Sequence, residues 1–123
     1  MSGNKLIVDT NIALYFLKGN SEITKFFEDY FICVSFITEL ELLSLNNMVD
    51  EDEKTINTFL NHVRIIDINS EIKAKTVDVR RESRLKLPDA IIAATAISMD
   101  LPLLTADLDF SKVDDPRILL FEV

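Results

Sequence analysis

The sequence of 123 residues contains a single histidine and a single cysteine. One cysteine excludes an internal disulfide, and Cys33 lies in the apolar stretch FICVSF, which is typical of a buried structural side chain. These counts also exclude paired-histidine ribonuclease chemistry and zinc sites built from several cysteines and histidines. A Ser-His-Asp triad through His62 stays formally open, but His62 is expected at the surface end of a helix. Chemistry in this chain must therefore depend mainly on carboxylates, hydroxyls and amides.

Long apolar runs and linker-like segments are scarce too. No stretch approaches the ~18 apolar residues of a membrane helix, so we expect no membrane association. Asp9 interrupts the short apolar stretch near the N-terminus, which argues against an export signal. Two glycines and three prolines leave little sequence for linkers. We expect one domain over residues 1–123, located in the cytoplasm.

Basic residues are fewer than acidic ones, since the sequence has 13 Lys and Arg residues and 21 Asp and Glu residues, for a net charge of −8. Contact with nucleic acid normally requires clustered positive charge, so distribution matters more than the total. One short stretch does concentrate basic residues, namely Arg80, Arg81, Arg84 and Lys86. This stretch is either a solvated helix face or an edge that follows the phosphates of a nucleic acid.

Short apolar runs alternate with longer amphipathic ones, a pattern that predicts a parallel sheet covered by helices on both faces. The fold class is therefore α/β, as a three-layer α/β/α sandwich with a central parallel sheet. Strands are expected at residues 5–8, 31–34, 64–68, 102–104 and 117–121. Helices are expected at residues 10–17, 21–30, 35–45, 51–63, 70–85 and 88–99.

Acidic side chains follow the expected strands. Asp9 comes directly after the first strand, while Asp107 and Asp109 follow the fourth. Ligands of open parallel sheets bind at the carboxyl ends of the strands. Each acid alone is explained by a helix cap or a turn, but separate caps have no reason to share one edge of one sheet.

Further acids begin helices that start at the same edge. Asp89 follows Pro88 and heads a helix, because proline favours the first helical turn. Glu39 and Glu41 fall early in the helix after the second strand. Carboxylates that converge repel one another and require a cation, and hard oxygen ligands suit Mg²⁺ or Mn²⁺.

Only one of the two glutamates can face such a site, because two helical positions differ by about 200°. We expect Glu41 to share the inward side with Ile37 and Leu40. Glu39 is then expected on the opposite side, in a solvated or partner-facing position.

A resemblance to a known family rests on the order and spacing of four motifs, namely IVDTN, VSFITELELL, LKLPDAIIAATA and LLTADLDF. Together they resemble the PIN-domain ribonucleases, especially the VapC-like toxins of toxin–antitoxin pairs, from about Leu6 to the last strand. The resemblance implies Mg²⁺- or Mn²⁺-dependent endoribonuclease activity that leaves a 5′-phosphate and a 3′-hydroxyl. It also implies a homodimer and a protein antitoxin that inhibits it.

Carried over position by position, the resemblance implies a set of site residues. Its catalytic acids are Asp9, Glu41, Asp89 and Asp107, supported by Asn11, Thr105 and Asp109. Within this set, Asp9, Asp89 and Asp107 are expected to bind metal, while Glu41 holds a water molecule or a second ion.

Two features depart from the family pattern. Many relatives place glycine after the glutamate motif, where this chain has Ser44 and Leu45. The last motif offers Asp109 beside Asp107 as a candidate fourth acid.

The alternatives are a DNA nuclease that uses the same carboxylates and a non-catalytic binding module with the PIN fold. A phosphate-accepting receiver domain is disfavoured, because it needs paired acids after the first strand, where this chain has Asp9, Thr10 and Asn11.

Overall fold

Five parallel strands form the centre of the molecule in the computed structural model, which describes residues 4–46 and 48–122. The spatial order is β3-β2-β1-β4-β5. The strands span Lys5–Val8 (β1), Phe31–Ser35 (β2), Arg64–Ile66 (β3), Leu103–Thr105 (β4) and Ile118–Leu120 (β5). β1 lies in the middle, where Ile7 pairs with Cys33 on one side and with Leu103 on the other.

The helices connect these strands. They span Thr10–Leu17 (α1), Ser21–Asp29 (α2), Phe36–Leu43 (α3), Asp50–His62 (α4), Ser70–Ser83 (α5) and Leu87–Met99 (α6). A short 3₁₀ helix, η1, spans Leu108–Lys112. Each expected strand and helix is present, β1 and α1 with the expected bounds and the others with shifted ends, whereas η1 was not predicted. No helix in the described ranges is long and apolar enough to cross a membrane.

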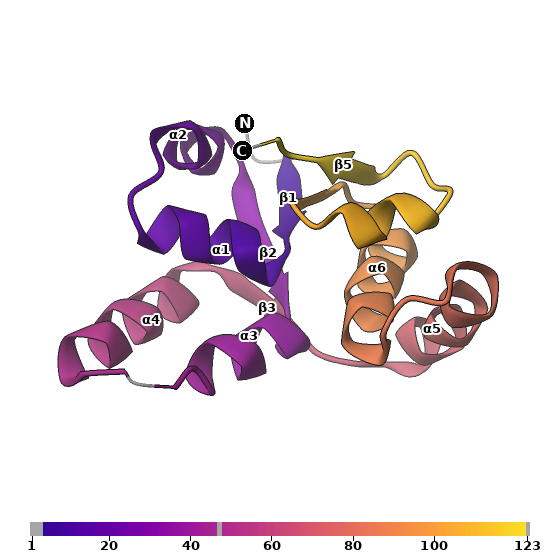
Figure 1. The fold of residues 1–123 in the computed structure, drawn as a ribbon, viewed down its shortest axis with the longest axis horizontal. Helices are drawn as coiled ribbons and strands as arrows, with labels where there is room; N and C mark the ends of the chain where they lie inside the picture. Colours follow the sequence, from indigo (N-terminus) through magenta and orange to yellow (C-terminus); the bar gives the residue numbers. More distant parts are fainter. Residues whose placement is uncertain (1–3, 47, 123) are drawn as a thin grey trace.

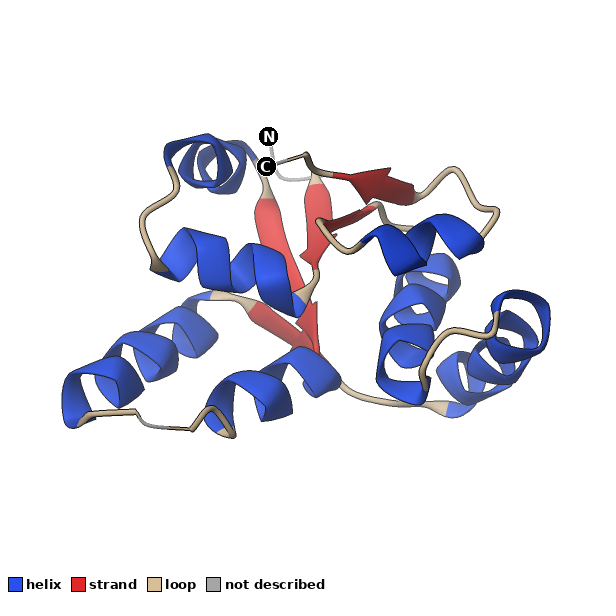
Figure 2. Ribbon diagram, viewed as in Figure 1, coloured by secondary structure: helices blue, strands red, loops and turns tan. Residues whose placement is uncertain are grey.

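Alternate strand residues pack into two separate cores, because successive side chains point to opposite faces of a sheet. Leu6, Val8, Val34 and Leu104 share one core with residues of α1 to α4. Ile7, Cys33, Ile66 and Leu103 share the other with residues of α5, α6 and η1. Figure 1 shows the two helical groups on opposite sides of the sheet, and Figure 2 shows the strands between them. The predicted three-layer α/β/α sandwich is confirmed.

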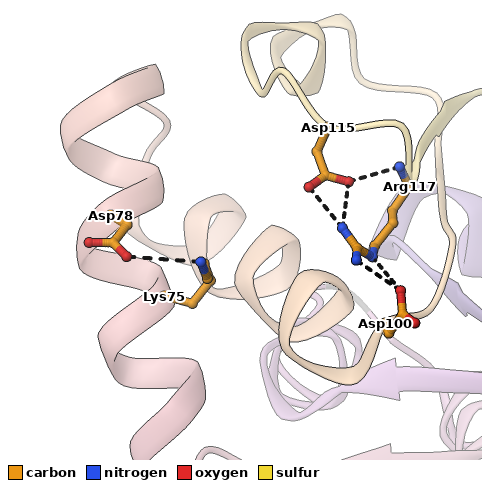
Figure 3. A network of polar contacts seen from close by, with 5 residues as sticks. All are labelled: Lys75, Asp78, Asp100, Asp115 and Arg117. Carbon is orange, nitrogen blue, oxygen red and sulfur yellow. Dashed lines mark hydrogen bonds and ion pairs between the residues drawn. The ribbon is translucent and has the colours of Figure 1, made fainter.

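Helix α6 is buried over seven consecutive residues, from Ala90 to Ala96, so it is enclosed on every side by the sheet, α3 and α5. Its far end is held by Arg117 (Figure 3), which donates through Nε to Asp100 at 2.9 Å and through Nη1 to Asp115 at 3.0 Å. Asp100 caps α6 in a left-handed conformation. This network fixes the end of α6 opposite to Asp89.

Candidate active site

The carboxyl ends of β1, β2 and β4 lie side by side, and helices α1 and α3 begin directly beyond β1 and β2. The chain passes from β1 to β2 on one side and later crosses from β3 to β4 on the other side of β1, and open α/β sheets bind ligands where the strand order reverses in this way. Helix α3 contacts both α1 and α6, so the first turns of these helices lie around one region (Figure 1). The sequence places its acids here.

Asp9 is the most buried of these acids, with 5% of its surface exposed. Its Oδ1 accepts a hydrogen bond from the backbone N–H of Thr10 at 2.7 Å, and its Oδ2 accepts one from Thr105 Oγ1 at 2.6 Å. Burial raises the pKa of Asp9 from 3.8 to about 6, and the charges of Asp89 and Asp107 add to this rise. The two hydrogen bonds oppose the rise, since they stabilise the ionised form.

Thr105 organises the loop after β4. Its hydroxyl donates to Asp9 and accepts a hydrogen bond from the backbone N–H of Asp107 at 3.0 Å. Asn11 Oδ1 accepts from the N–H of Ala106 at 3.4 Å, which ties the start of α1 to the same loop. The predicted supporting residues, Asn11 and Thr105, therefore both hold the segment that carries the fourth acid.

Asp107 and Asp109 differ in their surroundings. Asp107 is partly buried and caps η1, where its Oδ1 accepts from the N–H of Asp109 at 2.9 Å. The Asp109 side chain is about half exposed (52%) and lies 3.8 Å from Lys112 Nζ. The charge of Asp107 raises the pKa of both Asp9 and Asp89, whereas that of Asp109 raises the pKa of Asp89 alone. These contacts favour Asp107 as the fourth acid.

Asp89 lies in the first turn of α6 and is partly buried. Burial raises its pKa, followed by the negative charges of Asp107, Glu41 and Asp109, and Lys86 opposes the rise. Acids from two other segments, α3 and the start of η1, thus raise the pKa of one carboxylate on α6. The structure brings the predicted acids into one electrostatic neighbourhood.

Glu41 is exposed at the edge of this neighbourhood, where its Oε1 accepts a hydrogen bond from Thr10 Oγ1 at 2.6 Å. Glu39 forms no such side-chain contact with any described residue. The expected inward position of Leu40 is wrong, because Leu40 is 51% exposed and the buried residues of α3 are Thr38 and Leu42. The inward face follows this i, i+4 pair, and Glu39 and Glu41 lie on either side of it. The expected difference in their exposure is wrong, because Glu39 is partly buried whereas Glu41 is exposed.

Sequence reasoning missed Thr38, and it did not place Thr10 among the site residues. Thr38 is fully buried, and its hydroxyl lies 3.0 Å from that of Thr10. The available signal was a pair of hydroxyl residues in the first turns of two helices that follow neighbouring strands.

The basic residues lie at the junction between α5 and α6. Arg80 and Arg81 occupy the last turn of α5, Arg84 caps it with φ of 60°, and Lys86 caps the start of α6. All four are exposed, and none forms an ion pair with another described residue. Since the positive charge of Lys86 lowers the pKa of Asp89, this end of the basic stretch lies beside the acids.

No group of three His, Cys, Asp or Glu side chains within residues 4–46 and 48–122 converges closely enough to hold a metal ion as it stands. The donor types nonetheless fit Mg²⁺ or Mn²⁺, since they are carboxylates with hydroxyl and amide neighbours. Asp9 and Asp89 both carry raised pKa values, to which the negative charge of Asp107 contributes in each case, and a divalent cation would relieve this repulsion.

The family model that describes the PIN domain matches residues 6–116. No curated protein sequence matches the chain. A toxin–antitoxin complex from Klebsiella pneumoniae contains a chain with 31% sequence identity and a TM-score of 0.82, and the match covers 96% of this chain and 99% of that one.

Two further solved structures share the fold at lower identity. In VapBC2 from Rickettsia felis, bound to a DNA fragment from its promoter, the matched chain is 22% identical with a TM-score of 0.81, and 97% of this chain and 98% of that one are covered. In DNA-bound VapBC from Salmonella typhimurium, the matched chain is 21% identical with a TM-score of 0.83, and the match covers 97% of this chain and 98% of that one. Sequence, fold and family model agree: this chain belongs to the PIN domain family.

Proposed function

We propose that this chain is a Mg²⁺- or Mn²⁺-dependent endoribonuclease and the toxin of a toxin–antitoxin pair. The observation that carries the proposal is the buried Asp9 at the carboxyl end of β1, which Thr105 joins by hydrogen bonds to the loop that carries Asp107. The charges of Asp89 and Asp107 add to burial in raising the pKa of Asp9. Such an arrangement of acids disfavours the metal-free state and supports binding of a divalent cation. Nuclease activity is the general property of the PIN domain family.

In this proposal each acid has a separate task. Asp9, Asp89 and Asp107 would hold one or two divalent ions, which supply charge neutralisation at the phosphate and lower the pKa of a bound water. Glu41 Oε1 is engaged by Thr10, so Oε2 is the oxygen that would hold a metal-bound water or the second ion and accept the proton of the attacking water. Thr105 would keep Asp9 oriented through its hydroxyl.

Single-stranded or looped RNA is the proposed substrate, because an exposed backbone reaches a site at a sheet edge more easily than a duplex does. Arg80, Arg81, Arg84 and Lys86 would contact its phosphates beyond Asp89. The products would carry a 5′-phosphate and a 3′-hydroxyl.

The proposed partners follow from the relatives, whose solved structures are toxin–antitoxin complexes. A cognate antitoxin would place a basic side chain among the acids, because the chain carries a net charge of −8. We also propose that the chain forms a single nuclease domain, that two copies associate as a homodimer, and that the protein acts in the cytoplasm.

A non-catalytic binding module is the second candidate. It is favoured by one observation, that no three acids of the described ranges converge into a ready coordination sphere. A DNA nuclease with the same carboxylates is distinguished by substrate alone.

The test compares the purified full chain with Asp89→Asn on a labelled single-stranded RNA and on DNA of the same sequence. We expect cleavage of RNA with Mg²⁺, none with EDTA, and none by Asp89→Asn, which should retain its fold because Asp89 makes no side-chain hydrogen bond within the described residues. Asp29→Asn, an exposed acid at the end of α2, is the matched control. Full activity of Asp89→Asn would overturn the assignment, and Mg²⁺ binding without cleavage would favour the binding module.

A further inference from the structure

One residue, Thr10, contacts two of the acids at once. Its backbone N–H donates to Asp9 Oδ1 at 2.7 Å, and its side-chain Oγ1 donates to Glu41 Oε1 at 2.6 Å. Asp9 ends β1, whereas Glu41 lies on α3, which follows β2. Thr10 therefore connects acids that belong to different segments of the chain.

A second hydroxyl fixes the direction of this contact. Thr38 Oγ1 lies 3.0 Å from Thr10 Oγ1. Each hydroxyl carries one proton, and an ionised carboxylate only accepts, so the proton of Thr10 belongs to Glu41. Thr38 must then donate to Thr10, and the hydrogen bonds run in one sense, from Thr38 through Thr10 to Glu41.

Thr38 has no exposed surface, so water offers it no alternative partner. A buried hydroxyl without a hydrogen bond is costly, whereas valine would fill the same space without that cost. The hydroxyl at this position is thus explained by its contact with Thr10.

Four other helical threonines behave differently. The hydroxyls of Thr24, Thr55, Thr76 and Thr95 each donate to the carbonyl four residues earlier. Thr10 and Thr38 lie in the first turns of α1 and α3, where the residue four positions earlier belongs to the preceding strand and not to the helix. Their hydroxyls are free for a contact between helices.

We infer that Thr10 and Thr38 are positioning residues for Glu41, an inference that rests on the proposed nuclease function. Glu41 is exposed, and an unrestrained glutamate at such a position samples many rotamers. The bond from Thr10 holds Oε1, sets the spacing between Glu41 and Asp9, and leaves Oε2 directed at the reaction. Thr38 orients the Thr10 hydroxyl from within the core.

The first test removes the hydroxyl but keeps the shape. Thr10→Val retains the backbone N–H to Asp9 and loses the bond to Glu41. We expect single-turnover RNA cleavage to fall at least ~10-fold, the scale of one hydrogen bond to a charged group, with unchanged RNA affinity. Thr10→Ser should restore the rate, and Thr38→Val should reduce it to a smaller extent. Thr24→Val makes the same chemical change on α2 and should leave the rate unchanged.

The second test separates positioning from general stability. Mn²⁺ affinity is measured by calorimetry for the wild type, Thr10→Val, Glu41→Ala and the double variant. We expect Thr10→Val to weaken Mn²⁺ affinity several-fold when it is introduced into the wild-type chain. Introduced into Glu41→Ala, the same substitution should cause no further loss of Mn²⁺ affinity. An equal loss in both backgrounds would show a merely structural role and overturn the inference, as would wild-type affinity and rate in Thr10→Val.

The calorimetry also distinguishes the two levels of proposal. A wild type that binds Mn²⁺ but cleaves no RNA overturns the nuclease assignment, while the dependence of Mn²⁺ affinity on Thr10 and Glu41 still supports the positioning role. A wild type that binds no Mn²⁺ overturns both.

Discussion

Asp9 shows how a single residue serves both the fold and the site. It caps α1 through its contact with Thr10, and it accepts the hydroxyl of Thr105 from the neighbouring strand. These two bonds do not offset burial, because its pKa still rises to about 6. A residue needed only as a cap would be better placed at the surface, where the same bond to Thr10 is made without desolvation.

Glu39 and Glu41 lie two positions apart on α3 and point in different directions, so they form a matched pair. We expect Glu41→Gln to reduce single-turnover cleavage by at least ~100-fold, the scale of a positioned general base, because Glu41 alone is held by Thr10. Glu39→Gln should leave the rate nearly unchanged. Rates are measured at saturating Mn²⁺, and an inactive Glu39→Gln beside an active Glu41→Gln would contradict this placement.

Much of the residue-level site was predictable because it depends on local position. Asp9 and Asp107 follow strands, and Asp89 follows a proline that begins a helix. The bond between Thr10 and Thr38 was not predictable, since it joins residues 28 positions apart through the packing of α1 against α3. The error at Leu40 has the same origin, because the inward face of a short helix is set by its neighbours.

At the scale of elements, the junction between α5 and α6 joins the basic residues to the acids. Arg84 adopts a left-handed conformation that costs a non-glycine residue free energy, and it lies five residues before Asp89. Glycine would adopt this conformation without strain, so the arginine side chain at this position needs another reason. Contact with the phosphates of RNA is consistent with its exposure.

We predict that replacing Arg81 and Arg84 together by alanine weakens RNA binding and flattens its salt dependence, because both would neutralise phosphates. Single-turnover cleavage at saturating RNA should change little, since phosphate contacts position the substrate without breaking bonds. The matched control removes the same charge from Lys18 and Lys25, exposed residues at the end of α1 and on α2. Affinity is measured by fluorescence anisotropy across salt concentrations, and equal effects of the two double variants would contradict the assignment.

Element boundaries were less predictable than the elements themselves. The third strand was expected to reach residue 68, but it ends at Ile66 because Asp67 accepts the N–H of Ile68 and Asn69 caps α5. The 3₁₀ helix η1 depends on the cap that Asp107 provides to Asp109. Both outcomes arise from side-chain bonds to the backbone, which compete with strand pairing and leave little trace in hydrophobic periodicity.

At the scale of the whole molecule, several leucines on helices are exposed. Leu40 and Leu43 on α3 and Leu87 on α6 each expose between 46% and 51% of their surface. We predict that this apolar surface supports a homodimer, because adjoining exposed leucines are costly in a monomer. Light scattering at micromolar concentration should give the mass of a dimer, and the mass of a monomer would contradict the prediction.

The cluster of acids should also give the metal-free protein a distinctive dependence on pH. Because the pKa of Asp9 is about 6 in the folded chain and 3.8 ordinarily, the folded state binds more protons than the unfolded state between these values. The free energy of unfolding therefore falls as pH rises from 5 to 7.5, by about 1 kcal/mol from Asp9, and the raised pKa of Asp89 acts in the same direction.

We predict a melting temperature a few degrees lower at pH 7.5 than at pH 5 in EDTA, measured by calorimetry. Asp9→Asn should reduce this difference, because the amide carries no charge to desolvate, whereas the exposed control Asp29→Asn should preserve it. Mn²⁺ should raise the melting temperature more at pH 7.5 than at pH 5, since protons compete with the cation for the same carboxylates. A melting temperature that rises with pH in EDTA, or a Mn²⁺ effect larger at pH 5, would show that repulsion within the acid cluster does not control the stability of this fold.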